Sequence, residues 1–151
     1  MANLVEKQLI EPLLQVLKEE RFVILTTIDF ETGAPDMNAI SWVYAKDVNT
    51  IVLAVELQSK IVENIRRSPH VAIVLIANES TYSISGEAAI KKESVEGVSL
   101  PLAVIEMHIK EVKDVMFYGS AITAEPQYRK VYDESAADKL DQQVMDTLKE
   151  A

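Results

Sequence analysis

The sequence predicts a mainly β (α+β) domain in which six or seven antiparallel strands form a closed or nearly closed sheet. A helix is expected near each end of the chain, and one more between strands. Short runs rich in β-branched residues recur from residue 22 onward with turns of a few residues between them, which favours an antiparallel barrel or sandwich. Three other segments carry apolar residues at helical spacing. No linker or repeat divides the 151 residues, so we expect one domain, 1–151.

The first helical segment spans residues 5–20, where leucines recur every fourth residue from Leu9 to Leu17 and form one apolar stripe. Pro12 lies inside this segment and would remove a helical hydrogen bond. The proline is tolerated if the segment divides into a short arm and a helix that begins near Glu11, with Pro12 in its first turn. The sequence leaves both arrangements open.

Three strands are expected before the inserted helix. They are separated by turns at 31–35, which reads Glu-Thr-Gly-Ala-Pro, and at 47–49, which reads Asp-Val-Asn. Because these connections are short, the three strands should pair in order as an antiparallel meander. Their expected ranges are 22–28, 37–45 and 50–56.

The inserted helix is expected over residues 59–67, with Ser59 as its N-cap and Ser68-Pro69 at its end. Gly86 lies inside a later strand, which indicates a bulge or a close approach of two backbones. The later strands are expected at 71–77, 82–91, about 105–110 and 115–122, and a C-terminal helix at about 135–150.

The composition argues against several classes of function. The chain has no cysteine, and its four glycines form neither a P-loop nor a Gly-x-Gly-x-x-Gly turn. His70 and His108 have no second ligand at helical or hairpin spacing, so no metal site is predicted. A net charge of −9 argues against a nucleic-acid partner. With neither a secretory signal nor a long apolar run, we expect a cytoplasmic protein with no membrane partner.

The most informative position is the junction between the third strand and the inserted helix. The Ser59 hydroxyl, the Lys60 ammonium and the first free amides of the helix would converge there, at the positive end of the helix dipole. These donors suit a phosphate group. A serine N-cap followed by lysine is also an ordinary helix start, and the spacing alone does not separate the two readings.

A second cue is the stretch 38–44, Asn-Ala-Ile-Ser-Trp-Val-Tyr. It holds the only tryptophan, Trp42, next to small residues and Tyr44. Core packing would explain an aromatic side chain in a strand. The alternative is a wall for a planar ligand whose polar edge is read by backbone groups.

Taken in order, these parts resemble the pyridoxamine 5′-phosphate oxidase-like family of FMN-binding split barrels. The resemblance covers Phe22 to Ile90 and, more loosely, the strand around 104–112. It rests on the order and spacing of Thr26-Thr27, Gly33-x-Pro35, Ser41-Trp42-Val43-Tyr44, Ile51 to Val55, Ser59-Lys60, Asn64-Ile65, Ser68-Pro69-x-Val71-Ala72 and Tyr82-x-Ile84-x-Gly86-x-Ala88.

The resemblance implies a flavoprotein, an FMN-dependent oxidoreductase acting on an unknown small molecule. It also implies a homodimer with the cofactor in clefts between the subunits. The FMN phosphate would lie at Ser59 and Lys60, the flavin ring would lie along the second and third strands, and residues around Tyr118 of the partner chain would close the cleft. The cofactor-binding residues implied in this way are Asn38, Ala39, Ile40, Ser41, Trp42, Leu53, Val55, Ser59, Lys60 and Tyr118. No catalytic residue is implied.

The C-terminus departs from the family pattern. The full-length oxidases carry an arginine- and histidine-containing C-terminal segment, whereas residues 133–151 here read as an acidic helix. We therefore do not expect this chain to oxidise pyridoxamine phosphate. Two alternatives to an oxidoreductase stay open: a non-catalytic flavin- or ligand-binding module with a stress or sensor role, and a cofactor-free dimeric scaffold.

Overall fold

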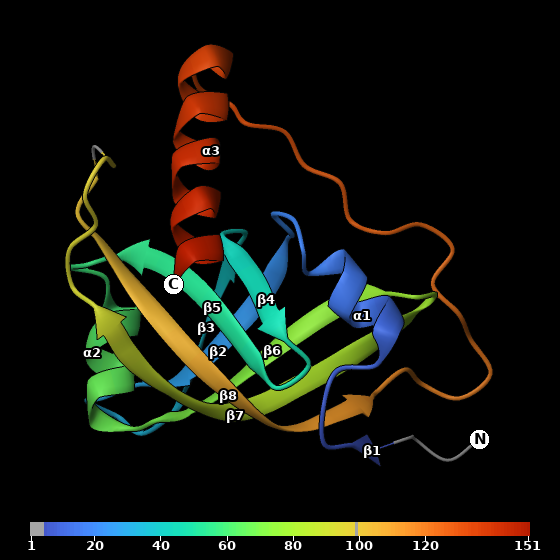
Figure 1. Ribbon diagram of the computed structural model, residues 1–151. Helices are drawn as coiled ribbons and strands as arrows, with labels where there is room; N and C mark the ends of the chain where they lie inside the picture. The colour runs from blue at the N-terminus through green and yellow to red at the C-terminus, as the bar shows by residue number, and fades with distance from the viewer. Residues whose placement is uncertain (1–4, 99) are drawn as a thin grey trace.

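The computed structural model describes residues 5–98 and 100–151. In this part of the chain, one antiparallel sheet of eight strands curls around the hydrophobic core (Figure 1). Seven strands follow the order β3-β2-β6-β7-β8-β5-β4, and the short β1 pairs with β8 beside this path. The strands are β1 (Val5–Glu6), β2 (Val23–Ile28), β3 (Pro35–Ile40), β4 (Val43–Asp47), β5 (Thr50–Glu56), β6 (His70–Ala77), β7 (Ser80–Lys92) and β8 (Leu102–Asp114). The predicted fold class, a mainly β split barrel with three helices, is confirmed.

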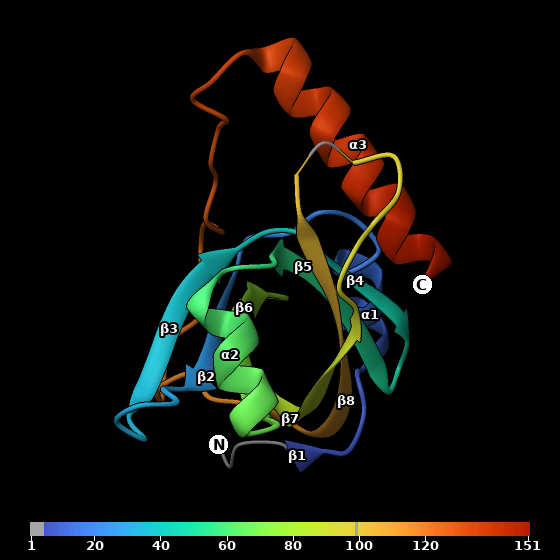
Figure 2. The same ribbon diagram turned by 90° about the vertical axis from the view of Figure 1, so that its left-hand side faces the viewer.

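The barrel is split between β3 and β4, which form the two edges of the sheet and lie on opposite sides of it in Figure 2. The prediction of one strand over 37–45 is therefore wrong, and so is the meander, because β3 pairs with β2 and β4 pairs with β5. The chain turns at Ser41, whose carbonyl accepts hydrogen bonds from the amides of Val43 and Arg21 at 2.9 and 3.0 Å. No glycine or proline marks this corner, so its sequence reads as continuous strand.

The described residues form three helices. They are α1 (Glu11–Val16), α2 (Lys60–Arg67) and α3 (Glu134–Glu150). Pro12 lies in the first turn of α1, so the second arrangement predicted for the N-terminal segment, an arm followed by a short helix, is confirmed. The leucine stripe from Leu9 to Leu17 is at most 2% exposed and packs into the barrel core. None of these helices is both long and apolar enough to cross a membrane.

Two apolar clusters hold the fold together. The larger one fills the barrel between the inward faces of the strands, α1 and α2. The smaller one lies on the outer face of β5 and β8 and is covered by α3, chiefly by Val144 and Leu148. Because both faces of β5 are buried, its sequence is a continuous apolar run instead of an alternating one.

Gly86 lies at a register shift between β7 and β8. A Cβ atom there would lie 2.1 Å from the carbonyl oxygen of His108. The predicted close approach of two backbones is confirmed.

The prediction of a strand over 115–122 is wrong. Residues 115–133 form no regular element and run back along the molecule to α3 (Figure 1). Gly119 has a positive φ of 80°, which interrupts an extended strand. Only the amides of Val115 and Ile122 bond to the backbone of the β6–β7 hairpin, so no ladder forms. Phe117 and Tyr118 are 70% and 86% exposed.

Candidate functional site

The start of α2 presents a polar side chain without a partner. Ser59 occupies the N-cap position with extended backbone angles, as predicted, but its side chain does not cap the helix. Its Oγ is buried and makes no hydrogen bond with any described residue. A buried hydroxyl left unbonded costs about 1–3 kcal/mol, so this atom requires an explanation. It lies where the first amides of α2 are also free.

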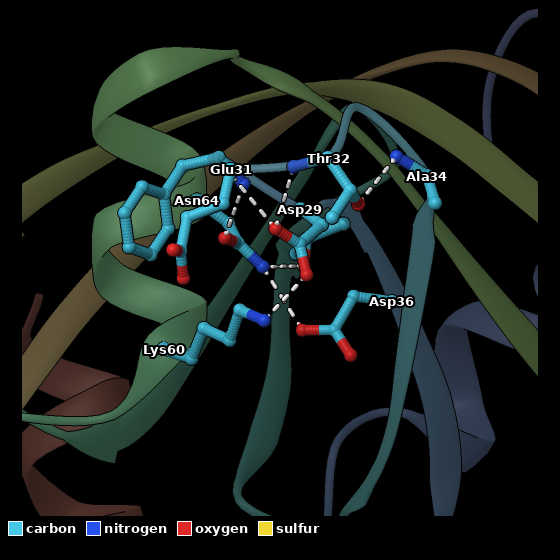
Figure 3. Close-up of polar contacts among 9 residues, drawn as sticks. Asp29, Glu31, Thr32, Ala34, Asp36, Lys60 and Asn64 are labelled. Carbon is cyan, nitrogen blue, oxygen red and sulfur yellow. Dashed lines mark hydrogen bonds and ion pairs between the residues drawn. The ribbon is translucent and has the colours of Figure 1, made fainter.

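Lys60, the next residue, extends its side chain to the turn between β2 and β3. Its ammonium donates to Oδ2 of Asp29 in an ion pair (Figure 3). The other oxygen of Asp29 accepts from the amides of Glu31 and Thr32 at 2.8 and 3.1 Å. The hydrogen bond from Lys60 and these two amides lower the pKa of Asp29 to about 2, and the hydrogen bond to Asp29 raises the pKa of Lys60. Both groups are therefore charged at neutral pH.

Asn64 fixes this arrangement from the second turn of α2. It is fully buried, and its Nδ2 donates to Oγ1 of Thr27 at 2.9 Å and to Oδ2 of Asp36 at 3.0 Å. Its Oδ1 accepts from the amide of Phe30 at 2.9 Å. A single amide side chain thus ties α2 to β2, to β3 and to the turn between them (Figure 3). Because each of these groups is satisfied, the turn and the helix start form one rigid unit.

The charges around Lys60 are predominantly negative. Asp29, Glu31 and Asp36 all raise the pKa of Lys60 through their charges. The two arginines at the end of α2 are paired with other carboxylates, Arg66 with Glu93 and Arg67 with Glu63. The hydroxyl, the ammonium and the helix amides suit a single phosphate group. Asp29 already uses the ammonium that such an anion would need.

An open strand edge leads away from this helix start. β3 pairs only with β2 among the described residues, so the backbone groups along its other edge are available to a ligand or a partner. Asn38 and Ala39 on this strand are exposed and Ile40 is half-buried. The Asp36 contact with Asn64 anchors the beginning of the same strand beside α2. These three predicted residues therefore lie on the open-edged strand whose beginning is linked to α2 by the hydrogen bond between Asp36 and Asn64.

Ser41 and Trp42 are bonded elsewhere within the chain. The Trp42 indole Nε1 donates to Oδ1 of Asp141 in α3 at 2.9 Å, and the Ser41 hydroxyl donates to Glu20. Lys130 bridges these two carboxylates at 2.9 and 3.1 Å. This network fastens α3 and the segment before it to the corner between the two edge strands. The structure thus gives Trp42 a packing environment against the outer cluster.

Leu53 and Val55 lie inside the barrel, where they are 1% and 6% exposed and pack in the larger core cluster. Their side chains support β5 and do not reach the surface beside α2. Tyr118 lies beyond the end of β8, on the 115–133 segment. It is exposed, and it is accessible to a second molecule.

The sequence did not identify Asp29 as part of the site, nor Asp36. An aspartate just before a turn is ordinarily a solvated residue that bonds its own backbone, as Asp29 in fact does. Nothing in the spacing indicates that this aspartate also reaches a lysine 31 positions later. Asn64 was part of the family resemblance, but its role as a buried link between α2 and two strands was not predicted.

A family model described as pyridoxamine 5′-phosphate oxidase matches residues 9–127. No curated protein sequence matches the chain. Among solved structures, a candidate pyridoxamine 5′-phosphate oxidase from Lactobacillus delbrueckii is 21% identical with a TM-score of 0.61, over 74% of this chain and 98% of that one. HupZ of Group A Streptococcus is 16% identical with a TM-score of 0.60, over 77% and 100%. An F420 reductase is 15% identical with a TM-score of 0.52, over 64% and 91%. At these identities the likeness concerns the fold.

Proposed function

The chain belongs to the pyridoxamine 5′-phosphate oxidase family, and we propose that it is an FMN-binding flavoprotein, an oxidoreductase acting on a small molecule. The observation that carries the proposal is the buried, unbonded hydroxyl of Ser59 beside Lys60 at the start of α2. A hydroxyl in this position gains a partner when an anion binds there. Membership of the family suggests FMN as the ligand. The unbonded Ser59 hydroxyl is the reason to expect the FMN phosphate at the start of α2.

Each residue at the start of α2 would make a different contribution to phosphate binding. The Ser59 hydroxyl and the free amides of the first turn would donate hydrogen bonds at the positive end of the helix dipole. Lys60 would add a charge-assisted hydrogen bond. Asn64 would keep the helix start in place against the turn between β2 and β3. The open edge of β3 would offer backbone donors and acceptors to the polar rim of a flat ring.

The bound flavin would supply the redox chemistry, since flavins transfer electrons or hydride without a nucleophile from the protein. The chain's own contribution would be to bind and orient the ring. No cluster of potential metal ligands occurs among residues 5–98 and 100–151, and the site described above contains no acid/base pair. This is consistent with a protein that leaves the chemistry to its cofactor.

We propose further that two copies of the chain form a homodimer and that the cofactor lies between them. Phe117, Tyr118 and Val131 are 70%, 86% and 82% exposed on the segment before α3. Exposed apolar side chains of this size would lose their contact with water in an interface, and the uncovered edge of β3 would also benefit from a partner. Sedimentation equilibrium should give twice the mass of the chain, and a monomer at micromolar concentration would rule out this assembly.

The test of flavin binding is a titration of the purified protein with FMN, followed by the absorbance and fluorescence of the flavin. We expect one FMN per chain. Lys60→Ala should weaken binding about tenfold or more, because a charge-assisted hydrogen bond contributes about 1.5–3 kcal/mol. Ser59→Ala should weaken it less. Lys113→Ala is the matched control, since Lys113 is also an exposed lysine paired with a carboxylate, at 3.0 Å from Glu111, but lies on β8.

The proposal fails if FMN neither binds nor raises the melting temperature, or if Lys60→Ala and Lys113→Ala behave alike. F420 serves as a second ligand in the same titration, because one similar fold is that of an F420 reductase. Reduction of the bound flavin by NADH or NADPH then separates an oxidoreductase from a binding module.

One observation favours a second candidate, the cofactor-free dimeric scaffold. Lys60 is neutralised by Asp29 without any ligand, so the helix start is electrostatically stable as it stands. A scaffold would form the dimer and bind neither FMN nor F420. The same titration, run beside the sedimentation experiment, distinguishes the two.

A further inference from the structure

Asp29 is held in position by its own turn. One carboxylate oxygen accepts the two backbone amides of the turn, and the other faces the Lys60 ammonium. The Asp29 side chain is 13% exposed, whereas that of Lys60 is 47% exposed. The carboxylate is therefore preorganised by its turn, and the lysine is the more exposed partner; Figure 3 shows the two side chains facing each other.

We propose that Asp29 is a built-in competitor for the cofactor phosphate. It holds Lys60 in the free protein, and an anion that binds at Ser59 and Lys60 has to compete with Asp29 for the ammonium. This inference rests on the proposed function, because it assigns a specificity-determining residue to the same site. It makes the FMN affinity of this chain a balance between two anions that compete for one cation.

The competition follows from charge and geometry. A phosphate that reaches the Lys60 ammonium approaches the Asp29 carboxylate as well, and two like charges at such short range repel each other. The repulsion grows with the charge of the ligand, so the site should discriminate against a doubly charged phosphate more strongly than against a singly charged phosphodiester. An unfavourable contact of this kind sets specificity as effectively as a favourable one.

Glu31 provides a matched control for this contact. It lies on the same turn and also raises the pKa of Lys60 through its charge, but it makes no hydrogen bond to the ammonium. Asp29→Asn and Glu31→Gln each remove one negative charge. Only the first removes the competitor, and an asparagine at position 29 can still accept the two turn amides through its Oδ1. Comparing the FMN affinities of the two variants separates the effect of the direct Asp29–Lys60 contact from the effect of the negative charge on the turn.

The experiment measures the FMN dissociation constant of the wild type, Asp29→Asn, Glu31→Gln and the double variant Asp29→Asn/Lys60→Ala at low ionic strength. We expect Asp29→Asn to bind about fivefold more tightly or better, and Glu31→Gln to gain about twofold or less, since an exposed ion pair contributes up to about 1 kcal/mol. The double variant Asp29→Asn/Lys60→Ala should not show the tighter FMN binding expected of Asp29→Asn. Inorganic phosphate should also raise the melting temperature of Asp29→Asn more than that of the wild type, a readout that needs no flavin.

Each outcome decides the proposal. Binding by Asp29→Asn when the wild type binds none supports it. If the wild type binds FMN and Asp29→Asn binds equally or less tightly, or if both charge variants gain equally, the competitor is refuted and the flavin site stands. If no variant binds FMN and phosphate stabilises none of them, both ideas fail. Asp29→Ser, which keeps a side-chain acceptor for the turn amides, replaces Asp29→Asn if circular dichroism shows that variant to be unfolded.

Discussion

Replacing Asn64 by alanine tests the link that positions the candidate site. The change removes three hydrogen bonds from a fully buried side chain. Thr27 is 1% exposed, so its hydroxyl loses its partner where water cannot replace it, at a cost of about 1–3 kcal/mol. The amide of Phe30 loses a further bond worth about 1 kcal/mol. Asp36 is half-buried and can regain water. The sum is about 2–4 kcal/mol.

Urea unfolding followed by circular dichroism measures this loss, and the melting temperature should fall by about 4–16 °C for a chain of this size. Asn38→Ala is the control, since it makes the same chemical change on the exposed strand β3 and should alter stability by no more than about 0.5 kcal/mol. A loss below about 1 kcal/mol for Asn64→Ala would refute the reasoning. It would mean that α2 is held to β2 and β3 by apolar packing alone.

Three further predictions concern other parts of the fold. Gly86→Ala should destabilise the protein by about 3 kcal/mol or more in urea unfolding, because its Cβ would lie 2.1 Å from the backbone oxygen of His108. The pKa of Asp29 is lowered from 3.8 to about 2. Its ion pair therefore stabilises the folded state fully above the ordinary pKa, and this stabilisation is lost as the pH falls from about 4 towards 2. Acid unfolding of Asp29→Asn should lack the loss of stability that the wild type shows over this pH range. Asp141→Ala should cost about 1–2 kcal/mol and shift the emission of Trp42, the only tryptophan, to longer wavelength as α3 loosens.

The sequence predicted the elements whose signals are local. The strand 50–56 and the inserted helix were placed within a residue of β5 and α2 because a continuous apolar run and a change of hydrophobic period mark them. Pro12 was assigned to the first turn of a short helix as one of two arrangements, since its steric cost allows few positions. Gly86 was recognised because an interior strand glycine usually marks close backbone contact.

The errors occur where tertiary contacts override local propensity. The corner at Ser41 carries strand-forming residues on both sides, and only the hydrogen bonds from Arg21 and Val43 to its carbonyl distinguish a corner from a strand. Residues 115–122 contain strand-forming residues but gain only two backbone bonds to the neighbouring hairpin. The Asp29–Lys60 pair joins a turn to a helix start across one end of the barrel. Local spacing carries no information about such a contact.

The environment of Trp42 is set by a helix that lies outside the family match. The match ends at residue 127, and α3 begins at Glu134. Without α3, the outer faces of β5 and β8 would expose an apolar surface, chiefly Val52 and Val104, and Trp42 beside it could line a ligand site. With α3 in place, that surface is covered and the indole donates to Asp141. We therefore place the proposed cofactor site at the start of α2, where Asp29 pairs with Lys60, and along the open edge of β3.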